Sequence, residues 1–224
     1  EDKTCKKVQT FLPIPVPGFM MRTSEFVEIL KSLGVMKHHF GKLVVNVANN
    51  HTFDTGGNGL ENTLSELRKL KCNIIGTYDS PNFKLKNGKI ICGCTTKMNP
   101  STYKNKRYLI EPSDLSALSF DILYVHWGWE YFEDPDSQTV LFSKEISKCK
   151  NLFAIIGHGP HLLQKAQMLP TKNKDNCLCF YSLGDTIVRA KRPVKMSNPR
   201  ALSGMLCLDR NNTFKMIGML QQHT

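Results

Sequence analysis

The stretch VVNVANNHTFDTGGNGLENT, residues 44–63, passes from strand-forming valines through a polar loop into a glycine-rich helix start. Lys42 to Val47 predicts a buried strand, and Leu60, Leu64 and Leu67 recur after it at helical spacing. Loops that follow strands are where α/β proteins place binding and catalytic groups. The polar residues between the strand and the helix therefore predict a functional site.

The same two patterns alternate along the rest of the chain. Further strands are expected at Asn73–Ile75, Ile90–Thr95, Asp121–His126, Leu152–Ile156, Cys177–Tyr181, Gly204–Leu208 and Thr213–Ile217. Helices are expected around Phe26, Ile29, Leu30 and Leu33, closed by Gly34, from Asn58 with Glu61 at capping-box spacing, and around Phe142, Ile146 and Cys149. Strands that alternate with helices indicate α/β packing, and the closing run of strands indicates an antiparallel part. We expect an extended, proline-containing segment over 1–22 and a single domain over 23–224.

The composition is that of a folded, basic protein. The chain has 224 residues, 41% of them hydrophobic, and a net charge of +11. Stretches such as KNGK, KNKR and RAKRPVK concentrate the lysines and favour an acidic polymer or a phosphorylated ligand as partner, although solvation of the surface explains them equally well. Nucleic acid is the lesser alternative, because no helix-turn-helix, zinc-finger or aromatic RNA-binding signature is found. No apolar run approaches the ~18 residues of a membrane span, so the chain as given is expected to be soluble.

Eight cysteines are many for a cytosolic protein of this size and favour an extracellular or cell-surface location. Cys92-Gly93-Cys94 and Cys177-Leu178-Cys179 form two C-x-C pairs, which predict a zinc site only if the pairs meet in space. The alternative is that each pair lies on one buried face of a strand. The sequon at Asn50 is predicted to be unused, because a glycan there would block the site.

Polar clusters follow three of the expected strands. They are Asn49-Asn50-His51 with Asp54, His126-Trp127-Gly128 with Glu130, and Gly157-His158-Gly159-Pro160-His161. Histidine is the commonest metal ligand and a carboxamide can supply a hard oxygen, so loops that converge at one sheet edge predict a site for one or two ions. Taken singly, each histidine has a structural explanation, and Trp127 and Trp129 have one as core residues.

The segments around these three clusters, together with a fourth motif near residue 183, resemble a known family in order and spacing. ANNHTFDTGGNGLENT (48–63), DILYVHWGWEY (121–131), IIGHGPHLLQ (155–164) and YSLGD (181–185) resemble the CapA/PgsA-type capsule proteins of bacterial poly-γ-glutamate synthesis. That family resembles the calcineurin-like metallophosphoesterases. The resemblance implies a four-layer αββα sandwich of two mixed sheets, incomplete at its N-terminus here.

The resemblance also implies roles for individual residues. Metal ligands would be Asn50, His126 and His161, with His158 adjacent. His51, oriented by Asp54, would protonate the leaving oxygen while a metal-activated water attacks. The implied substrate contacts are Asn49, Trp127, Glu130, Ser182 and Asp185.

Three departures from the family pattern change these expectations. The first histidine of the family's His-Pro-His is Gly159 here, and Asp185 replaces an asparagine. The Gly-Asp strand and the Asn-Leu-Glu segment, which supply carboxylates in the family, are not found before Asn50. Two dications without a bridging carboxylate would repel each other, so we expect one ion (Mn, Fe, Zn or Mg) or none rather than two.

The sequence leaves two main hypotheses, with nucleic-acid binding as the lesser third. The first is a divergent member that binds or processes an acidic polymer such as poly-γ-glutamate, with a missing N-terminal segment or an assembly partner. The second is an active metal-dependent phosphoesterase that uses His51, Asn50, His126 and His161.

Overall fold

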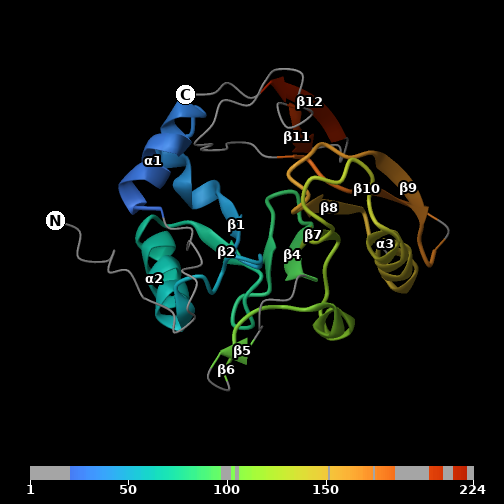
Figure 1. Cartoon of the computed structure of the whole chain (residues 1–224), viewed down its shortest axis with the longest axis horizontal. Coiled ribbons are helices and arrows are strands. Elements are labelled where there is room, and N and C mark those ends of the chain that lie inside the picture. Colours follow the sequence, from blue (N-terminus) through green and yellow to red (C-terminus); the bar gives the residue numbers. More distant parts are fainter. Residues whose placement is uncertain are drawn as a thin grey trace.

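The computed structural model describes residues 21–96, 102–103, 106–150, 152–173, 175–184, 202–208 and 214–220 (Figure 1). The elements in chain order are α1 (Thr23–Ser32), η1 (Lys37–Lys42), β1 (Val44–Asn46), α2 (Gly56–Lys69), β2 (Asn73–Ile75), β3 (Asn82–Lys84), β4 (Ile90–Thr95), β5 (Thr102–Tyr103), β6 (Lys106–Arg107), η2 (Pro112–Ala117), β7 (Ile122–His126), α3 (Ser137–Cys149), β8 (Ala154–His158), β9 (Ala166–Pro170), β10 (Asn176–Phe180), β11 (Leu202–Leu208) and β12 (Phe214–Leu220). Residues 1–20 of the expected N-terminal segment lie outside the described part.

A six-stranded mixed sheet forms the centre of the molecule. Its strand order is β3-β4-β7-β8-β10-β9, in which β4, β7, β8 and β10 run parallel and the edge strands β3 and β9 run antiparallel to their neighbours. A second, two-stranded sheet pairs β1 with β2 in parallel. The chain thus has the mixed α/β architecture that the alternating patterns predicted, and the antiparallel closing strands β11 and β12 were also predicted.

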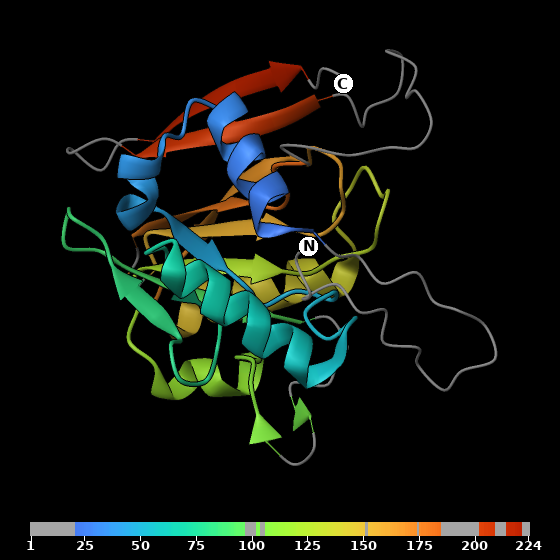
Figure 2. The same cartoon turned by 90° about the vertical axis from the view of Figure 1, so that its left-hand side faces the viewer.

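The two sheets lie between helices (Figure 2). Helices α1 and α2 cover the β1-β2 sheet, and the leucines of α2 join a buried cluster there with Val47 and Ile74. On the other side, α3 and η2 cover the six-stranded sheet, whose alternate residues Leu123 and Val125 point into a second buried cluster. This order of helices, sheet, sheet and helices is the predicted four-layer sandwich.

The faces of the two sheets touch directly where small residues allow it. The amide Nδ2 of Asn46, at the end of β1, donates a hydrogen bond of 3.2 Å to the carbonyl of Tyr124 in β7. A side chain at Gly93 would place its Cβ 2.5 Å from Asn46 Oδ1 and 2.8 Å from Gly76 Cα. Glycine at position 93 is therefore required for the sheets to approach, and this approach brings the end of β1 against the middle of β7.

Some element boundaries differ from the prediction. Helix α2 begins at Gly56 rather than at Asn58, and its N-cap Thr55 makes no side-chain cap hydrogen bond. The predicted capping box between Asn58 and Glu61 is therefore wrong, because Asn58 already lies inside the first turn. Gly34, with φ of +77°, ends the first helix as predicted.

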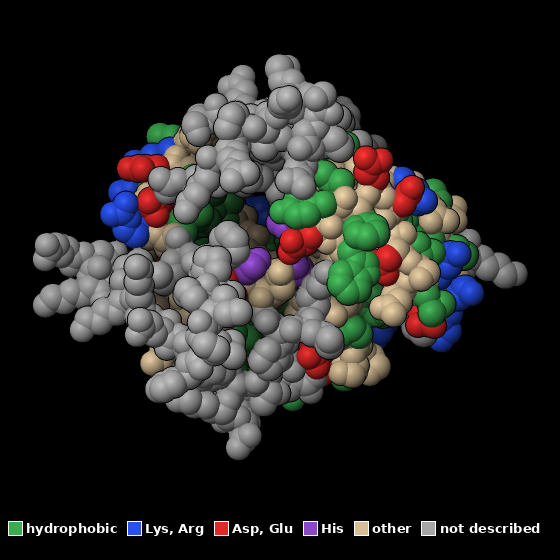
Figure 3. Space-filling model, viewed as in Figure 1, with side chains coloured by type: hydrophobic (Ala, Val, Ile, Leu, Met, Phe, Trp, Pro, Cys, Tyr) green, Lys and Arg blue, Asp and Glu red, His purple; other side chains and the backbone are tan. Residues whose placement is uncertain are grey.

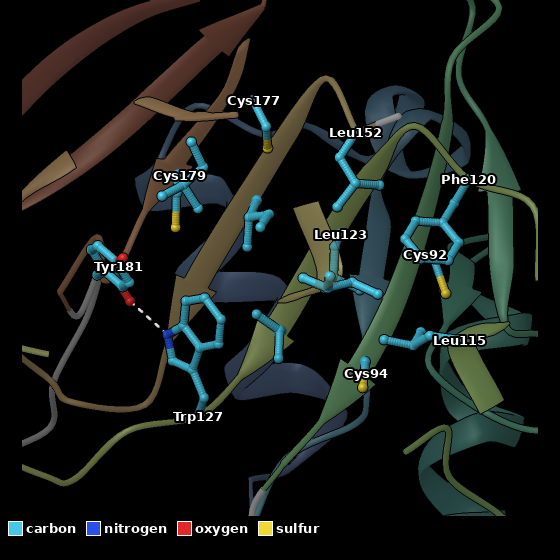
Figure 4. Packing of buried hydrophobic residues seen from close by; sticks show 14 of the residues in the cluster. Cys92, Cys94, Leu115, Phe120, Leu123, Trp127, Leu152, Cys177, Cys179 and Tyr181 are labelled. Carbon is cyan, nitrogen blue, oxygen red and sulfur yellow. Dashed lines mark hydrogen bonds between the residues drawn. The ribbon is translucent and has the colours of Figure 1, made fainter. Parts of the chain in front are cut away.

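The two C-x-C pairs lie on strands that do not touch each other (Figure 4). β7 and β8 separate β4 from β10, which puts the pairs roughly 14 Å apart at ordinary strand spacing. All four thiols are buried and free, and burial raises the pKa of Cys92 and of Cys177 to about 12. The zinc hypothesis for these pairs is wrong, and the alternative of a shared buried face is confirmed.

Candidate functional site

The loop after β1 is held in shape by its own polar residues. Asn49 Oδ1 accepts a hydrogen bond of 2.9 Å from the backbone N–H of His51, and the Asn49 N–H donates to Thr52 Oγ1. Thr52 Oγ1 in turn donates to the carbonyl of Val47. Asn49 therefore stabilises the conformation of the loop, and Asn50 is half-buried.

His51 and Asp54 pair as the sequence predicted. His51 Nδ1 lies 2.9 Å from Asp54 Oδ2, and 41% of the His51 side chain is exposed. A carboxylate at Nδ1 favours the proton on that nitrogen and leaves Nε2 as the atom that meets a ligand. The pair can thus present an oriented imidazole to solvent.

His126 and His158 form a second pair at the ends of adjacent strands. They are register partners on β7 and β8, and their Nδ1 atoms lie 3.0 Å apart. One of the two nitrogens donates and the other accepts, so neither Nδ1 is open to another ligand while this hydrogen bond exists. His126 is buried, and its carbonyl accepts a hydrogen bond from the N–H of Thr96.

His158 carries an unsatisfied polar atom. Its Nε2 is buried without a hydrogen-bond partner. Burial, and secondly the nearby His161, lower the pKa of His158 to about 4, so this imidazole is neutral at pH 7. A neutral histidine with a buried, unpaired ring nitrogen would suit a bound ion or water.

His161 lies beside a loop that follows β7. Its ring stacks on Tyr131 with centroids 5.5 Å apart, and its Nε2 lies 3.9 Å from Glu130 Oε1. Backbone φ is +63° at His161 and +123° at Gly159. A Cβ added at Gly159 would lie 2.4 Å from the carbonyl oxygen of Trp127, so no histidine fits at position 159 in this backbone.

Two predicted substrate contacts are core residues. Trp127 is fully buried, and its indole N–H donates a hydrogen bond of 2.7 Å to the carbonyl of Tyr181 (Figure 4). Ser182 is also buried, and its Oγ accepts from the N–H of Gly184. Trp127 is therefore a core residue, which was the alternative interpretation from the sequence. A further predicted contact, Asp185, lies outside the described residues.

Histidine side chains lie at the edge of a hollow near the centre of the face shown in Figure 3. The contacts above join His126 to His158 and place His161 near them; that His51 shares the same point stays a prediction. Within the part of the chain that the structure describes, no group of three or more His, Cys, Asp or Glu side chains could hold a metal ion. The described donors thus suit a single ion at most, through neutral histidine nitrogens, and do not fit a two-metal centre.

Sequence reasoning missed the exposed aromatic residues beside these histidines. Trp129, Tyr131 and Phe132 are 60%, 48% and 58% exposed, although Trp129 had been open to interpretation as core. Alternation could not have found them, because Trp127, Trp129 and Tyr131 have the same parity and a continuous strand would place all three on one face.

Comparison with known proteins identifies the family. The family model for the bacterial capsule synthesis protein PGA_cap matches residues 19–91 and 95–190, which is more than half of the chain. The chain belongs to the PGA_cap family. Over 189 residues it is 29% identical to the PGA biosynthesis protein CapA of Bacillus subtilis (strain 168), covering 75% of this chain and 46% of that protein.

Two further known proteins are similar to this PGA_cap chain at lower sequence identity. The capsule biosynthesis protein CapA of Bacillus anthracis is 25% identical over 173 residues, covering 66% of this chain and 40% of that protein. Among solved structures, the NAD nucleotidase NadN of Haemophilus influenzae aligns with a TM-score of 0.44 and 14% identity, covering 86% of this chain and 41% of that chain. The chain spans less than half the length of these curated relatives. No helix of the described residues has the length and apolar character to cross a membrane.

Proposed function

We propose that this PGA_cap chain serves capsule synthesis at the cell surface by binding an acidic polymer such as poly-γ-glutamate through its lysine-rich surface. The curated relatives are named for PGA and capsule biosynthesis, and the net charge of +11 suits a polyanionic ligand. The observation that carries the proposal is a cluster of exposed cations at the amino ends of β1 and β2.

This basic patch consists of Lys37, Lys42, Arg68, Lys69 and Lys71. η1 supplies the first two residues, and the end of α2 with the turn after it supplies the others. The two segments are held together because Asn73 Nδ2 donates to the carbonyl of Gly41, next to the patch. All five cations are exposed, and Glu66 pairs with Lys69 at 2.6 Å. A flexible polyanion can meet several of these charges at once, with an affinity that falls as salt rises.

The strand-end histidines support binding rather than two-metal hydrolysis. Gly159 occupies the position of a family metal ligand, and its backbone leaves no room for a side chain. The direct hydrogen bond between His126 and His158 occupies the Nδ1 atom of each ring, so these two nitrogens are not available to an ion while the bond exists. The histidines therefore support at most a single-ion site at the carboxyl ends of β7 and β8, whereas the basic patch lies at the amino ends of β1 and β2.

The second candidate, a metal-dependent phosphoesterase, is favoured by the His51–Asp54 pair. The family resemblance offers Asn50, His126, His158 and His161 to an ion, although the described geometry does not bring the three histidines together as one ligand set; a bound ion would activate water and polarise the scissile group. Asp54 holds the proton at His51 Nδ1, which leaves Nε2 to exchange a proton with the leaving oxygen. This chemistry needs the exposed His51 to face the other histidines.

The test compares retention of the chain on immobilised poly-γ-glutamate and on immobilised DNA across a salt gradient. We expect the chain to elute from polyglutamate at distinctly higher salt than the variant Lys42→Gln/Lys71→Gln. The variant Lys144→Gln/Lys148→Gln, which removes two cations from α3, serves as the matched control and should elute like the wild type. Equal retention on both polymers would leave only generic electrostatics and would contradict the proposal.

Metal analysis and turnover of a chromogenic phosphodiester decide the second candidate. A bound divalent ion together with activity that is lost in both His51→Ala and His126→Ala would establish the phosphoesterase. Turnover that persists in His51→Ala would exclude the proton-transfer role of this residue.

A further inference from the structure

The loop after β7 exposes much of three large aromatic side chains, of which Tyr131 also stacks on His161. Trp129, Tyr131 and Phe132 are exposed within four consecutive positions, and Figure 3 shows hydrophobic side chains projecting beside the histidines with Asp and Glu between them. Large exposed apolar patches with polar residues around them mark interaction surfaces. We call residues 129–134 the aromatic–acidic loop.

The backbone of this loop is fixed by its neighbours. The N–H of Tyr131 donates a hydrogen bond of 2.8 Å to the carbonyl of Pro160, and the carbonyl of Phe132 accepts one of 2.8 Å from Gln164 Nε2. Tyr131 has a φ of +65°, a conformation that a tyrosine adopts only where its surroundings impose it. The aromatic rings are therefore displayed by a pre-organised segment, which lowers the entropy that a partner must overcome on binding.

The charge of the loop is opposite to that of the chain. Glu130, Glu133 and Asp134 are all exposed, and no lysine or arginine occurs between Ile122 and Ser143. Asp134 pairs with Lys165 at 3.1 Å, while the chain as a whole carries +11. A local acidic surface with aromatic faces repels an acidic polymer, a nucleic acid and an anionic membrane alike, and it attracts a cation that can stack on a ring.

We propose that the aromatic–acidic loop is the docking surface for a basic, arginine-bearing segment of a partner protein. A guanidinium stacks on an aromatic face while it pairs with a carboxylate, whereas a lysine ammonium is more strongly hydrated and does this less well. Carboxylates interleaved with exposed rings in one fixed loop match that double preference. The inference does not depend on the polymer bound elsewhere on the chain.

The test measures binding of two fluorescent peptides of equal length, oligo-arginine and oligo-lysine, to the full chain by anisotropy at physiological ionic strength. We expect oligo-arginine to bind roughly fivefold more tightly than oligo-lysine. In Trp129→Ala/Phe132→Ala this preference should disappear, and in Glu130→Gln/Glu133→Gln both peptides should bind more weakly. The matched control Tyr78→Ala/Glu28→Gln, which removes one exposed ring and one exposed carboxylate elsewhere, should bind like the wild type.

Specific outcomes would overturn this inference. A preference for arginine that survives in Trp129→Ala/Phe132→Ala, or equal binding of the two peptides by the wild type, would show that the rings take no part. Sedimentation that reveals a dimer of the chain, converted to monomer by the same variant, would assign the loop to self-association instead. Unchanged urea midpoints in the variants verify folding, because the substituted side chains are exposed.

Discussion

Replacement of the buried tryptophan tests how the site is anchored to the core. In Trp127→Phe the 2.7 Å hydrogen bond to the carbonyl of Tyr181 is lost, and the carbonyl is left buried without its donor. An unsatisfied buried group costs about 1–3 kcal/mol. The smaller ring leaves a cavity beside Phe142 and Tyr181, which adds about 1 kcal/mol. We expect a total loss of about 2–4 kcal/mol in the free energy of unfolding.

The chain has two tryptophans, so the matched control is Trp129→Phe. Trp129 is 60% exposed, and its substitution should change the free energy of unfolding by less than about 0.5 kcal/mol. Urea unfolding followed by far-UV circular dichroism measures both variants, and the dependence on urea should keep the same slope. Equal destabilisation by the two substitutions, or a larger effect at Trp129, would refute the assignment of Trp127 as the anchor.

Three further predictions concern the residues around this anchor. Gly159→Ala should lower the free energy of unfolding by about 2–4 kcal/mol, because the added Cβ would meet the carbonyl of Trp127. The control Gly88→Ala, at a position with positive φ but open space, should lower it by only about 1–2 kcal/mol. Similar losses for the two variants in urea unfolding would contradict the close contact. The pKa of His158 is about 4 in the folded chain against an ordinary 6.5, so the unfolded chain takes up the proton first as the pH falls. The free energy of unfolding should therefore be highest above pH 6.5 and fall by up to about 3 kcal/mol as the pH drops to 4. The same pH dependence in His158→Asn would contradict this prediction. Ellman's reagent should modify the thiols of the two C-x-C pairs in urea but not in the native chain, because all four are buried and have raised pKa values (Cys92, Cys94, Cys177 and Cys179). Fast labelling of these positions in the native chain would contradict the strand assignments.

Most of the fold could be predicted from the periodicity of apolar residues in the sequence. Cys92 and Cys94 share one strand face, as do Leu123 and Val125, and both pairs are buried together under α3 and η2 as alternation requires. The leucine spacing of α2 likewise located its buried side. These elements were predictable because burial on one face leaves a regular pattern in the chain.

Other elements have no such pattern. β9 exposes four of its five residues, so nothing in its sequence indicates a strand until β10 pairs with it. The start of α2 lies in glycines, which ordinary helix propensities disfavour, and the local hydrogen bonds of the loop before it set the boundary. Neither a distant strand partner nor a loop conformation of this kind leaves a periodic pattern in the sequence.

The site was predictable by residue type but not by contact. Strand-end positions identified His126 and His158, yet their direct hydrogen bond follows from the register of β7 against β8, which no local pattern encodes. Trp127 keeps the parity of the buried face, and Gly128, with φ of +69°, then turns the chain so that Trp129 leaves that face. The exposed loop therefore follows from a backbone turn that the residue pattern alone does not reveal.

The most direct test of polymer binding is the affinity of the chain for fluorescent poly-γ-glutamate, measured by anisotropy with and without EDTA. We predict the same affinity in both conditions, a steep loss of affinity with added salt, and clear weakening in Lys42→Gln/Lys71→Gln. Binding that EDTA abolishes and that the lysine variant retains would contradict it, because the polymer would then be held through a metal at the histidines rather than by the basic patch.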